Sequence, residues 1–207
     1  MVRGDFGLIA ICSVMSPSHF LVGLGCLLIS LPAWAQDIPA SSWTPAKFQP
    51  LAEDLRRASN AQPPTLYEGL PHQFVEHELF LRERDTKSVV ESHGYLFYKR
   101  PLPLGAADAA AVRATLLDAA TYKPYSGPKS CGGFHPDYRL VWGGGRAARE
   151  VQFCFGCREI KLFDNNQVLV ADLPNAAYLH LRVLLGRYQA QRPPRASSRE
   201  RAAALTR

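Results

Sequence analysis

The stretch at residues 131–157 decides the fold, and it reads CGGFHPDYRLVWGGGRAAREVQFCFGC. It opens with a loop-forming segment that contains His135, and it closes with a tight Cys-Phe-Gly-Cys turn at 154–157. Between them, a glycine run separates two apolar segments, which is typical of two antiparallel strands joined by a turn. We therefore predict a β-hairpin that turns about Gly144 and carries four sulfur and nitrogen ligands at one end, namely Cys131, His135, Cys154 and Cys157.

The position of the turn also predicts a register for the two strands. With the turn at Gly144, Phe134 lies opposite Cys154, and Cys131 lies opposite Cys157. The three cysteines and His135 then share one end of the sheet, close enough to bind a common metal ion or to react with one another.

Further strands and helices are expected before and after this hairpin. Short apolar or aromatic runs bounded by turn residues predict strands at 94–98, Tyr138–Trp142, Arg149–Cys154, 158–163 and 167–173. Leucine and valine at helical spacing predict helices at 108–120 and 174–188. The sequence thus predicts the α+β class, with an antiparallel β-meander of four to five strands packed against two helices.

Three segments flank the single domain that we predict at 66–191. An apolar core that ends in Ala33-Trp34-Ala35 is typical of a cleaved signal peptide at 1–35. A Pro/Ala/Ser-rich lead or linker follows at 36–65, and it contains one short amphipathic helix at 47–58. The tail at 192–207 has five arginines and one glutamate among small residues, so its composition predicts disorder.

The signal peptide predicts a periplasmic or secreted protein. Its apolar core is shorter than the roughly 20 residues that a spanning helix needs, so we expect no integral membrane span after cleavage. A lipoprotein anchored at Cys26 and a translation start at Met15 remain open alternatives. The tail contributes four of the six net positive charges, so weak contacts with anionic surfaces are expected there, without specific nucleic-acid binding.

The cysteine pattern has three possible chemical interpretations. Three thiolates and one imidazole form a known tetrahedral zinc set, which would use all four residues at the base of the hairpin. Asp137 or a backbone carbonyl would then hold the second ring nitrogen of His135. An oxidising compartment instead favours a structural disulfide, between Cys154 and Cys157 or between Cys131 and either of them. A thiol-redox enzyme that uses Cys154 and Cys157 is the third interpretation, although such pairs usually lie at a helix N-terminus.

Known catalytic fingerprints are absent from the sequence, including G-x-S-x-G, H-E-x-x-H, the phosphate loop and the dinucleotide-binding motif. We therefore favour a small non-catalytic module with a zinc site of three cysteines and one histidine, and a disulfide-stapled binding or structural domain is the alternative. In the segment LYEGLPH, Glu68 and His72 are candidate polar site residues brought in from a distance. The segment is otherwise a structured loop in which Tyr67 and Leu70 fill the core.

The segments at 133–138, 154–157 and 179–193, together with LYEGLPH, resemble a family of uncharacterised bacterial exported proteins. Members carry a GFHPDY-like segment, a CFGC turn and a C-terminal helix that ends near Arg-Pro. The resemblance spans about residues 66–193 and implies an exported protein with a site at the cysteine turn, without an established activity. The family pattern has a histidine after the second cysteine, whereas this chain has Arg158, which argues against a metal ligand at that position.

Gln36 should be the N-terminal residue of the exported protein, because the small-x-small pattern at Ala33 and Ala35 directs signal cleavage to the bond that follows. Mass spectrometry of the protein recovered from the periplasm or medium measures this directly. A chain that still begins at Met1, or one that is lipid-modified at Cys26, would contradict the prediction.

Overall fold

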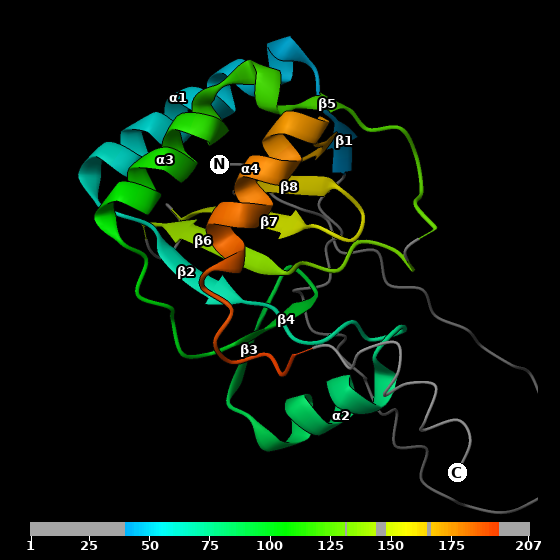
Figure 1. Cartoon of the computed structure of the whole chain (residues 1–207). Coiled ribbons are helices and arrows are strands. Elements are labelled where there is room, and N and C mark those ends of the chain that lie inside the picture. Colours follow the sequence, from blue (N-terminus) through cyan, green and yellow to red (C-terminus); the bar gives the residue numbers. More distant parts are fainter. Residues whose placement is uncertain (1–39, 131, 144–147, 165–166, 195–207) are drawn as a thin grey trace, which may run out of the picture. The chain divides into compact units, whose positions relative to one another are not determined.

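The computed structural model describes residues 40–130, 132–143, 148–164 and 167–194 (Figure 1). Its centre is an antiparallel meander of four strands: β6 Tyr138–Trp142, β7 Arg149–Cys154, β8 Glu159–Phe163 and β9 Val168–Asp172. These strands follow the sequence prediction closely, because each is an apolar run closed by turn residues. The α+β class and the mostly antiparallel sheet are confirmed.

The sheet is larger than the predicted four to five strands. β2 Thr65–Glu68 pairs antiparallel with β6, and β1 Ala40–Ser42 pairs parallel with β9. β5 Lys123–Pro124 also pairs with β9, which gives seven strands among the described residues, in the order β1-β9-β8-β7-β6-β2 with β5 beside β9. The three additional strands are short and lie in Pro- and Ser-rich sequence, where no alternation of apolar and polar residues marks a strand.

The strand predicted at 94–98 forms, but outside the main sheet. β3 Val89–Ser92 and β4 Tyr95–Tyr98 make a separate two-stranded hairpin. His93 and Gly94 connect them, and both have positive φ angles of 52° and 80°. A two-residue turn with two such angles matches the twist of a hairpin, which explains the tight connection.

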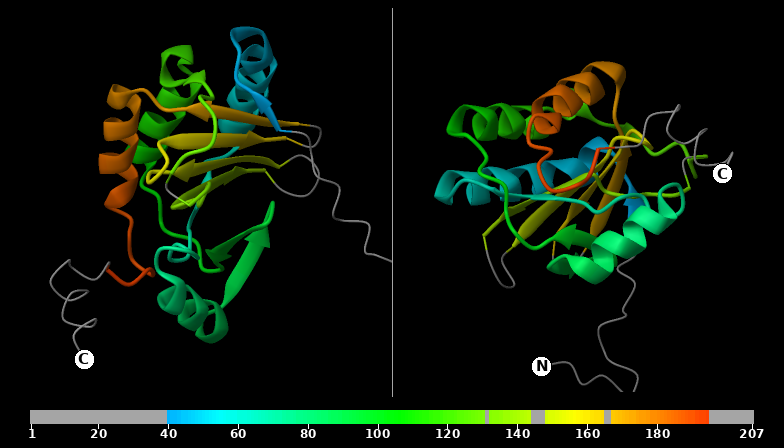
Figure 2. Two further views of the ribbon diagram at one scale, coloured as in Figure 1. Left: turned by 90° about the vertical axis from the view of Figure 1, so that its right-hand side faces the viewer. Right: turned by 60° about the horizontal axis from the view of Figure 1, so that its bottom comes forward.

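Three helices bury apolar residues in the same core as one face of the main sheet: α1 Pro45–Ala61, α3 Ala106–Leu117 and α4 Asn175–Gly186 (Figure 2). α3 and α4 are the two predicted helices. α1 contains the amphipathic helix expected at 47–58, and its predicted apolar face of Phe48, Leu51 and Leu55 is buried. Part of the segment predicted as a lead or linker therefore belongs to the core of the domain.

A fourth helix, α2 His77–Thr86, was missed by the sequence analysis. Most of its side chains are charged or polar, so no apolar stripe reveals it. It is attached through a polar contact, because the hydroxyl of Tyr98 on β4 donates a 3.0 Å hydrogen bond to the buried carboxylate of Glu83. Within the residues that the structure describes, none of the helices has the length and apolar character needed to cross a membrane.

The face of the sheet opposite the helices carries a buried polar cluster. Its centre is Glu150, which accepts hydrogen bonds from the Ser92 hydroxyl at 3.0 and 2.8 Å and from the Gln152 amide at 2.6 Å. The Arg139 guanidinium lies 2.8 Å from the same carboxylate. Because Ser92 belongs to β3, this cluster joins the small hairpin to the main sheet.

The predicted hairpin of β6 and β7 is present, but its register was wrong. Tyr138 pairs with Phe153 and Trp142 pairs with Arg149, so the connection is residues 143–148 and not a tight turn at the glycines. The backbone N–H of Asp137 donates to the carbonyl of Phe153 at 2.7 Å, which brings Asp137, and not Phe134, to the level of Cys154. Cys131, which was predicted to lie opposite Cys157, is outside the described residues.

The chain after α4 folds back onto the end of β2. Glu68 is almost fully buried, and its Oε2 accepts the backbone N–H groups of Ala190 and Gln191 at 3.2 and 2.7 Å. Next along the chain, Arg192 donates from Nη1 to Asp137 at 2.8 Å and from Nε to the Gly69 carbonyl at 3.0 Å. The tail predicted at 192–207 is described only as far as Pro194, and its first residue contacts the domain.

Replacing Arg192 by alanine should lower the free energy of unfolding by about 2–3 kcal/mol, because a buried ion pair that loses one partner leaves an uncompensated charge. Arg187→Ala is the matched control: its ion pair with Asp108 has a similar length, 2.9 Å against 2.8 Å, but its side chain is 59% exposed against 8% for Arg192. The control should change the free energy by less than about 1 kcal/mol. Urea denaturation of both variants makes the comparison, and equal losses would contradict it.

Candidate functional site

The Cys-Phe-Gly-Cys turn follows β7, and the sulfur of Cys154 organises it. This Sγ atom accepts the backbone N–H of Cys157 at 3.3 Å and that of His135 at 3.5 Å. The first contact closes the turn, and the second ties the turn to the segment before β6. Cys154 is 2% exposed and Cys157 is 6% exposed, so both residues are screened from solvent.

Cys154 is a free cysteine with a protonated thiol at neutral pH. Burial raises the pKa of its thiol to about 11, because surroundings of low polarity disfavour the thiolate, and the backbone N–H groups offset only part of that effect. Catalytic and redox cysteines have lowered pKa values. The environment of Cys154 is therefore the opposite of what the thiol-redox interpretation requires.

Cys154 is a free cysteine, so the disulfide that the sequence allowed between Cys154 and Cys157 is not formed. Cys131, the other predicted member of the group, lies outside the described residues. The Sγ atom of Cys157 lies 3.1 Å from the carbonyl oxygen of Gly133, so this cysteine is also packed against the loop before β6.

The imidazole of His135 stacks on that of His72, with ring centroids 4.7 Å apart. Burial lowers the pKa of His135 to about 4, and the nearby Arg192 guanidinium acts in the same direction, so the ring is neutral at pH 7. The ring of His72 is oriented by its own loop, since its Nδ1 accepts the backbone N–H groups of Phe74 and Val75 at 3.2 and 3.3 Å. The distant segment LYEGLPH therefore does reach the predicted site.

The predicted metal ligands are only partly brought together. Cys154 and Cys157 share one turn, and His135 reaches Cys154 through its backbone. Among the residues that the structure describes, no group of three or more His, Cys, Asp or Glu side chains is placed to hold a metal ion. The full set of four ligands includes Cys131 and so extends beyond those residues.

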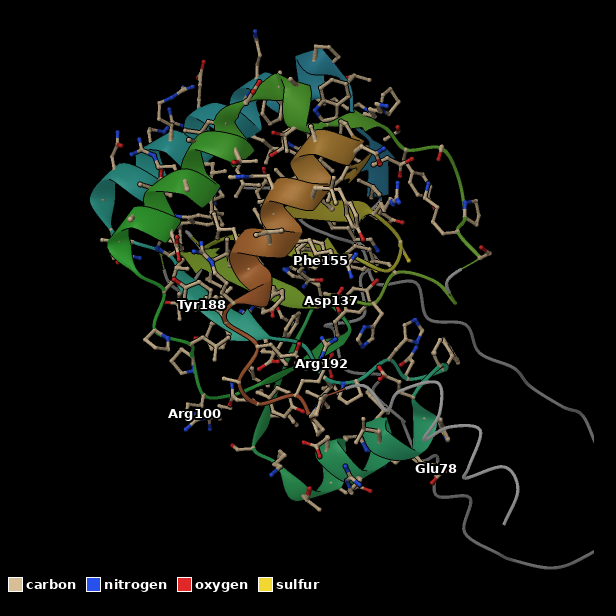
Figure 3. All side chains as sticks on the ribbon, viewed as in Figure 1. Glu78, Arg100, Asp137, Phe155, Tyr188 and Arg192 are labelled. Carbon is tan, nitrogen blue, oxygen red and sulfur yellow. The ribbon has the colours of Figure 1, made fainter. Side chains whose placement is uncertain are left out.

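The zinc interpretation expected Asp137 or a backbone carbonyl to hold the ring of His135, and the structure shows the backbone carbonyl, that of Pro71. Asp137 has other partners. Its Oδ2 accepts the backbone N–H of Phe155 at 2.7 Å, and its Oδ1 accepts the 2.8 Å hydrogen bond from Arg192. Asp137, Phe155 and Arg192 lie close together beside α4 (Figure 3). This carboxylate thus connects the cysteine turn to the segment that follows α4.

A cavity of about 620 Å³ opens beside the cysteine turn. One wall is the turn itself, through Phe155, Gly156 and Arg158. A second part of the lining comes from α4, through Tyr178 and Arg182, and a third comes from the chain after α4, through Gln189, Arg192 and Pro194. Three buried or half-buried residues of the sheet side also line it, namely Glu68, Asp137 and Tyr138.

Two of the three arginines in this cavity have no carboxylate partner among the described residues. Arg158 donates to the Asn175 side chain at 2.7 Å, and its guanidinium carbon lies 4.7 Å from the ring centroid of Tyr178. Arg182 donates to the hydroxyl of the same tyrosine at 2.8 Å. Tyr178 therefore holds two guanidinium groups in place, one at its ring face and one at its hydroxyl.

Comparisons with protein-family models, with curated proteins and with solved structures gave no match to this chain. The motif resemblance described above therefore stays a prediction. The cavity itself was missed by sequence reasoning, because its arginines come from separate segments. Only one local signal was available: Tyr178 and Arg182 are four residues apart and so lie on the same side of α4.

Gly69→Ala should disrupt this region, because an added Cβ would overlap the carbonyl oxygen of Pro136 and push the segment before β6 away from β2. We expect a loss of about 2 kcal/mol or more in the free energy of unfolding. Gly156→Ala is the control, since a Cβ at that position of the cysteine turn meets nothing within 4 Å. Urea denaturation of both variants tests this, and equal tolerance at the two positions would show that the close approach is not needed.

Proposed function

We propose that this chain is an exported, non-catalytic binding module in which a Cys131–Cys157 disulfide staples the cysteine turn. The observation that carries the proposal is that the turn is also a wall of the 620 Å³ cavity, through Phe155, Gly156 and Arg158. Cavities that bind small ligands combine apolar side chains with a few fixed polar groups. In this cavity, Phe155 and Tyr178 are the apolar side chains, and the arginines are the fixed polar groups.

The chemistry of the site supports binding over catalysis. A nucleophile needs a neighbouring base or a lowered pKa. The thiol of Cys154 has a raised pKa and lies in contact with backbone N–H groups, while the ring of His135 stacks on His72. The cavity side chains include arginine, tyrosine, phenylalanine and glutamate, which suit recognition of a ligand.

A zinc site formed by Cys131, His135, Cys154 and Cys157 is the second candidate. The observation in its favour is that Cys154 Sγ accepts two backbone N–H groups, since hydrogen bonds of this kind also stabilise a metal-bound thiolate. A neutral His135 is likewise the form that coordinates a metal ion. Zinc would then supply folding free energy at the same end of the sheet that the disulfide would otherwise staple.

Thiol counting combined with metal analysis separates the two candidates. The exported protein, which we expect to begin at Gln36 and so to keep three of the five cysteines, is purified from an oxidising compartment, and its thiols are titrated before and after denaturation without reductant. The disulfide predicts one reactive thiol, that of Cys154, which appears only after denaturation, and no bound zinc. The zinc site predicts three reactive thiols in denaturant with chelator, and one zinc ion per chain.

Two variants serve as controls for the thiol count. Cys154→Ala should remove the one thiol and leave the disulfide intact, whereas Cys157→Ser should expose a second thiol, that of Cys131. A metal-free protein in which all three thiols react, or in which Cys154 reacts rapidly before denaturation, would contradict the proposed staple.

A further inference from the structure

Unbalanced positive charge marks one side of the cavity. Arg192 is neutralised by Asp137, whereas Arg158 and Arg182 have neutral hydrogen-bond partners, Asn175 and Tyr178. A guanidinium has five N–H donors, so each of these two arginines keeps several donors for a ligand. Two guanidinium groups in one cavity match the geometry and charge of a carboxylate or a phosphate.

The two arginines are held in position before any ligand binds. The ring of Tyr178 lies 4.7 Å from the guanidinium carbon of Arg158 and 5.7 Å from that of Arg182. Tyr178 is itself buried and packs edge-to-face against Phe155, with ring centroids 6.1 Å apart. Side chains fixed in this way lose less conformational entropy on binding than free surface arginines do.

The inner wall of the cavity has the opposite charge. Asp137 is paired there with Arg192, whereas Glu68 has no ion pair among the described residues, and its Oε1 is buried without a hydrogen-bond partner in the same part of the chain. A second anionic group at this wall would be repelled, so a ligand that fills the cavity carries its negative charge only at the arginine side. Its remaining part would lie against Phe155 and Tyr138, which favours an apolar or aromatic body.

We infer that the cavity is a binding site for a small organic anion, whose single carboxylate or phosphate group is held by Arg158 and Arg182. The ligand has an apolar or aromatic body that lies against Phe155 and Tyr138. This inference rests on the proposed binding function and adds the chemical class of the ligand.

Isothermal titration calorimetry on the exported protein tests the inference with four probes: benzoate, phenyl phosphate, benzamide and inorganic phosphate. Benzamide has the shape of benzoate without its charge, and inorganic phosphate has the charge without the ring. We expect the first two to bind at least about tenfold more tightly than the last two, with affinity that falls as salt rises. The tighter of benzoate and phenyl phosphate identifies the preferred anionic group.

Variants then locate the site. Arg158→Gln and Arg182→Gln should each weaken binding of the better anion about tenfold or more, and both side chains are exposed enough for the fold to tolerate the change. Arg187→Gln, at the end of the same helix, is the control and should keep full affinity, because Arg187 pairs with Asp108 outside the cavity. Equal binding of benzamide, no binding of either organic anion, or full affinity in the two cavity variants would overturn the inference.

The outcome is distinguishable from a failure of the proposed staple when the same preparation is used for thiol counting. Anion binding by a protein without the disulfide would leave the ligand class standing and refute the staple. A disulfide-bonded protein that binds none of the anions would refute the ligand class and leave the staple standing.

Discussion

The carboxylate of Asp137, which is largely removed from solvent, is the interaction on which this end of the molecule depends. A carboxylate taken out of water is stable only when donors or positive charge replace its hydration. Here the backbone of Phe155 and the guanidinium of Arg192 provide that replacement. One side chain thereby fixes three segments that are far apart in sequence: the loop before β6, the cysteine turn and the chain after α4. The walls of the cavity are set by these same three segments.

The same rule operates on the opposite face of the sheet. Glu150 is buried, and Arg139, Gln152 and Ser92 surround it. A purely apolar contact would let the β3–β4 hairpin slide across the sheet, whereas a carboxylate with directional donors accepts one placement. The described fold therefore has an apolar core on its helical face and uses compensated charges to attach its smaller parts.

The extent to which the sequence predicted this structure follows from how local each feature is. The meander and α4 could be predicted because apolar runs, turn residues and helical spacing are all contained in short windows. The register of β6 and β7 could not, since a run of three glycines permits several turn lengths and only the pairing of Tyr138 with Phe153 selects among them. α2 was missed because it is held by a hydrogen bond between Glu83 and Tyr98 and not by an apolar face.

The candidate site shows the same division. The sequence correctly brought Cys154, Cys157 and His135 to one end of the hairpin, because they flank it directly. It could not show that Glu68, Arg158 and Arg182 line one cavity, since those residues meet only after β2, the cysteine turn and α4 have packed. Arg158 was noted only as a departure from a motif, yet its position after the turn places its guanidinium against Tyr178.

Cys154 connects the stability of the turn with the environment proposed for the protein. A free thiol in an oxidising compartment survives only if it is inaccessible and protonated, because the thiolate is the reactive form. Burial and a pKa of about 11 meet both conditions. The sulfur can therefore remain a hydrogen-bond acceptor for the backbone of Cys157 and His135. This arrangement keeps the turn rigid, and a rigid turn positions Phe155 and Arg158 on the cavity wall without a further cost on binding.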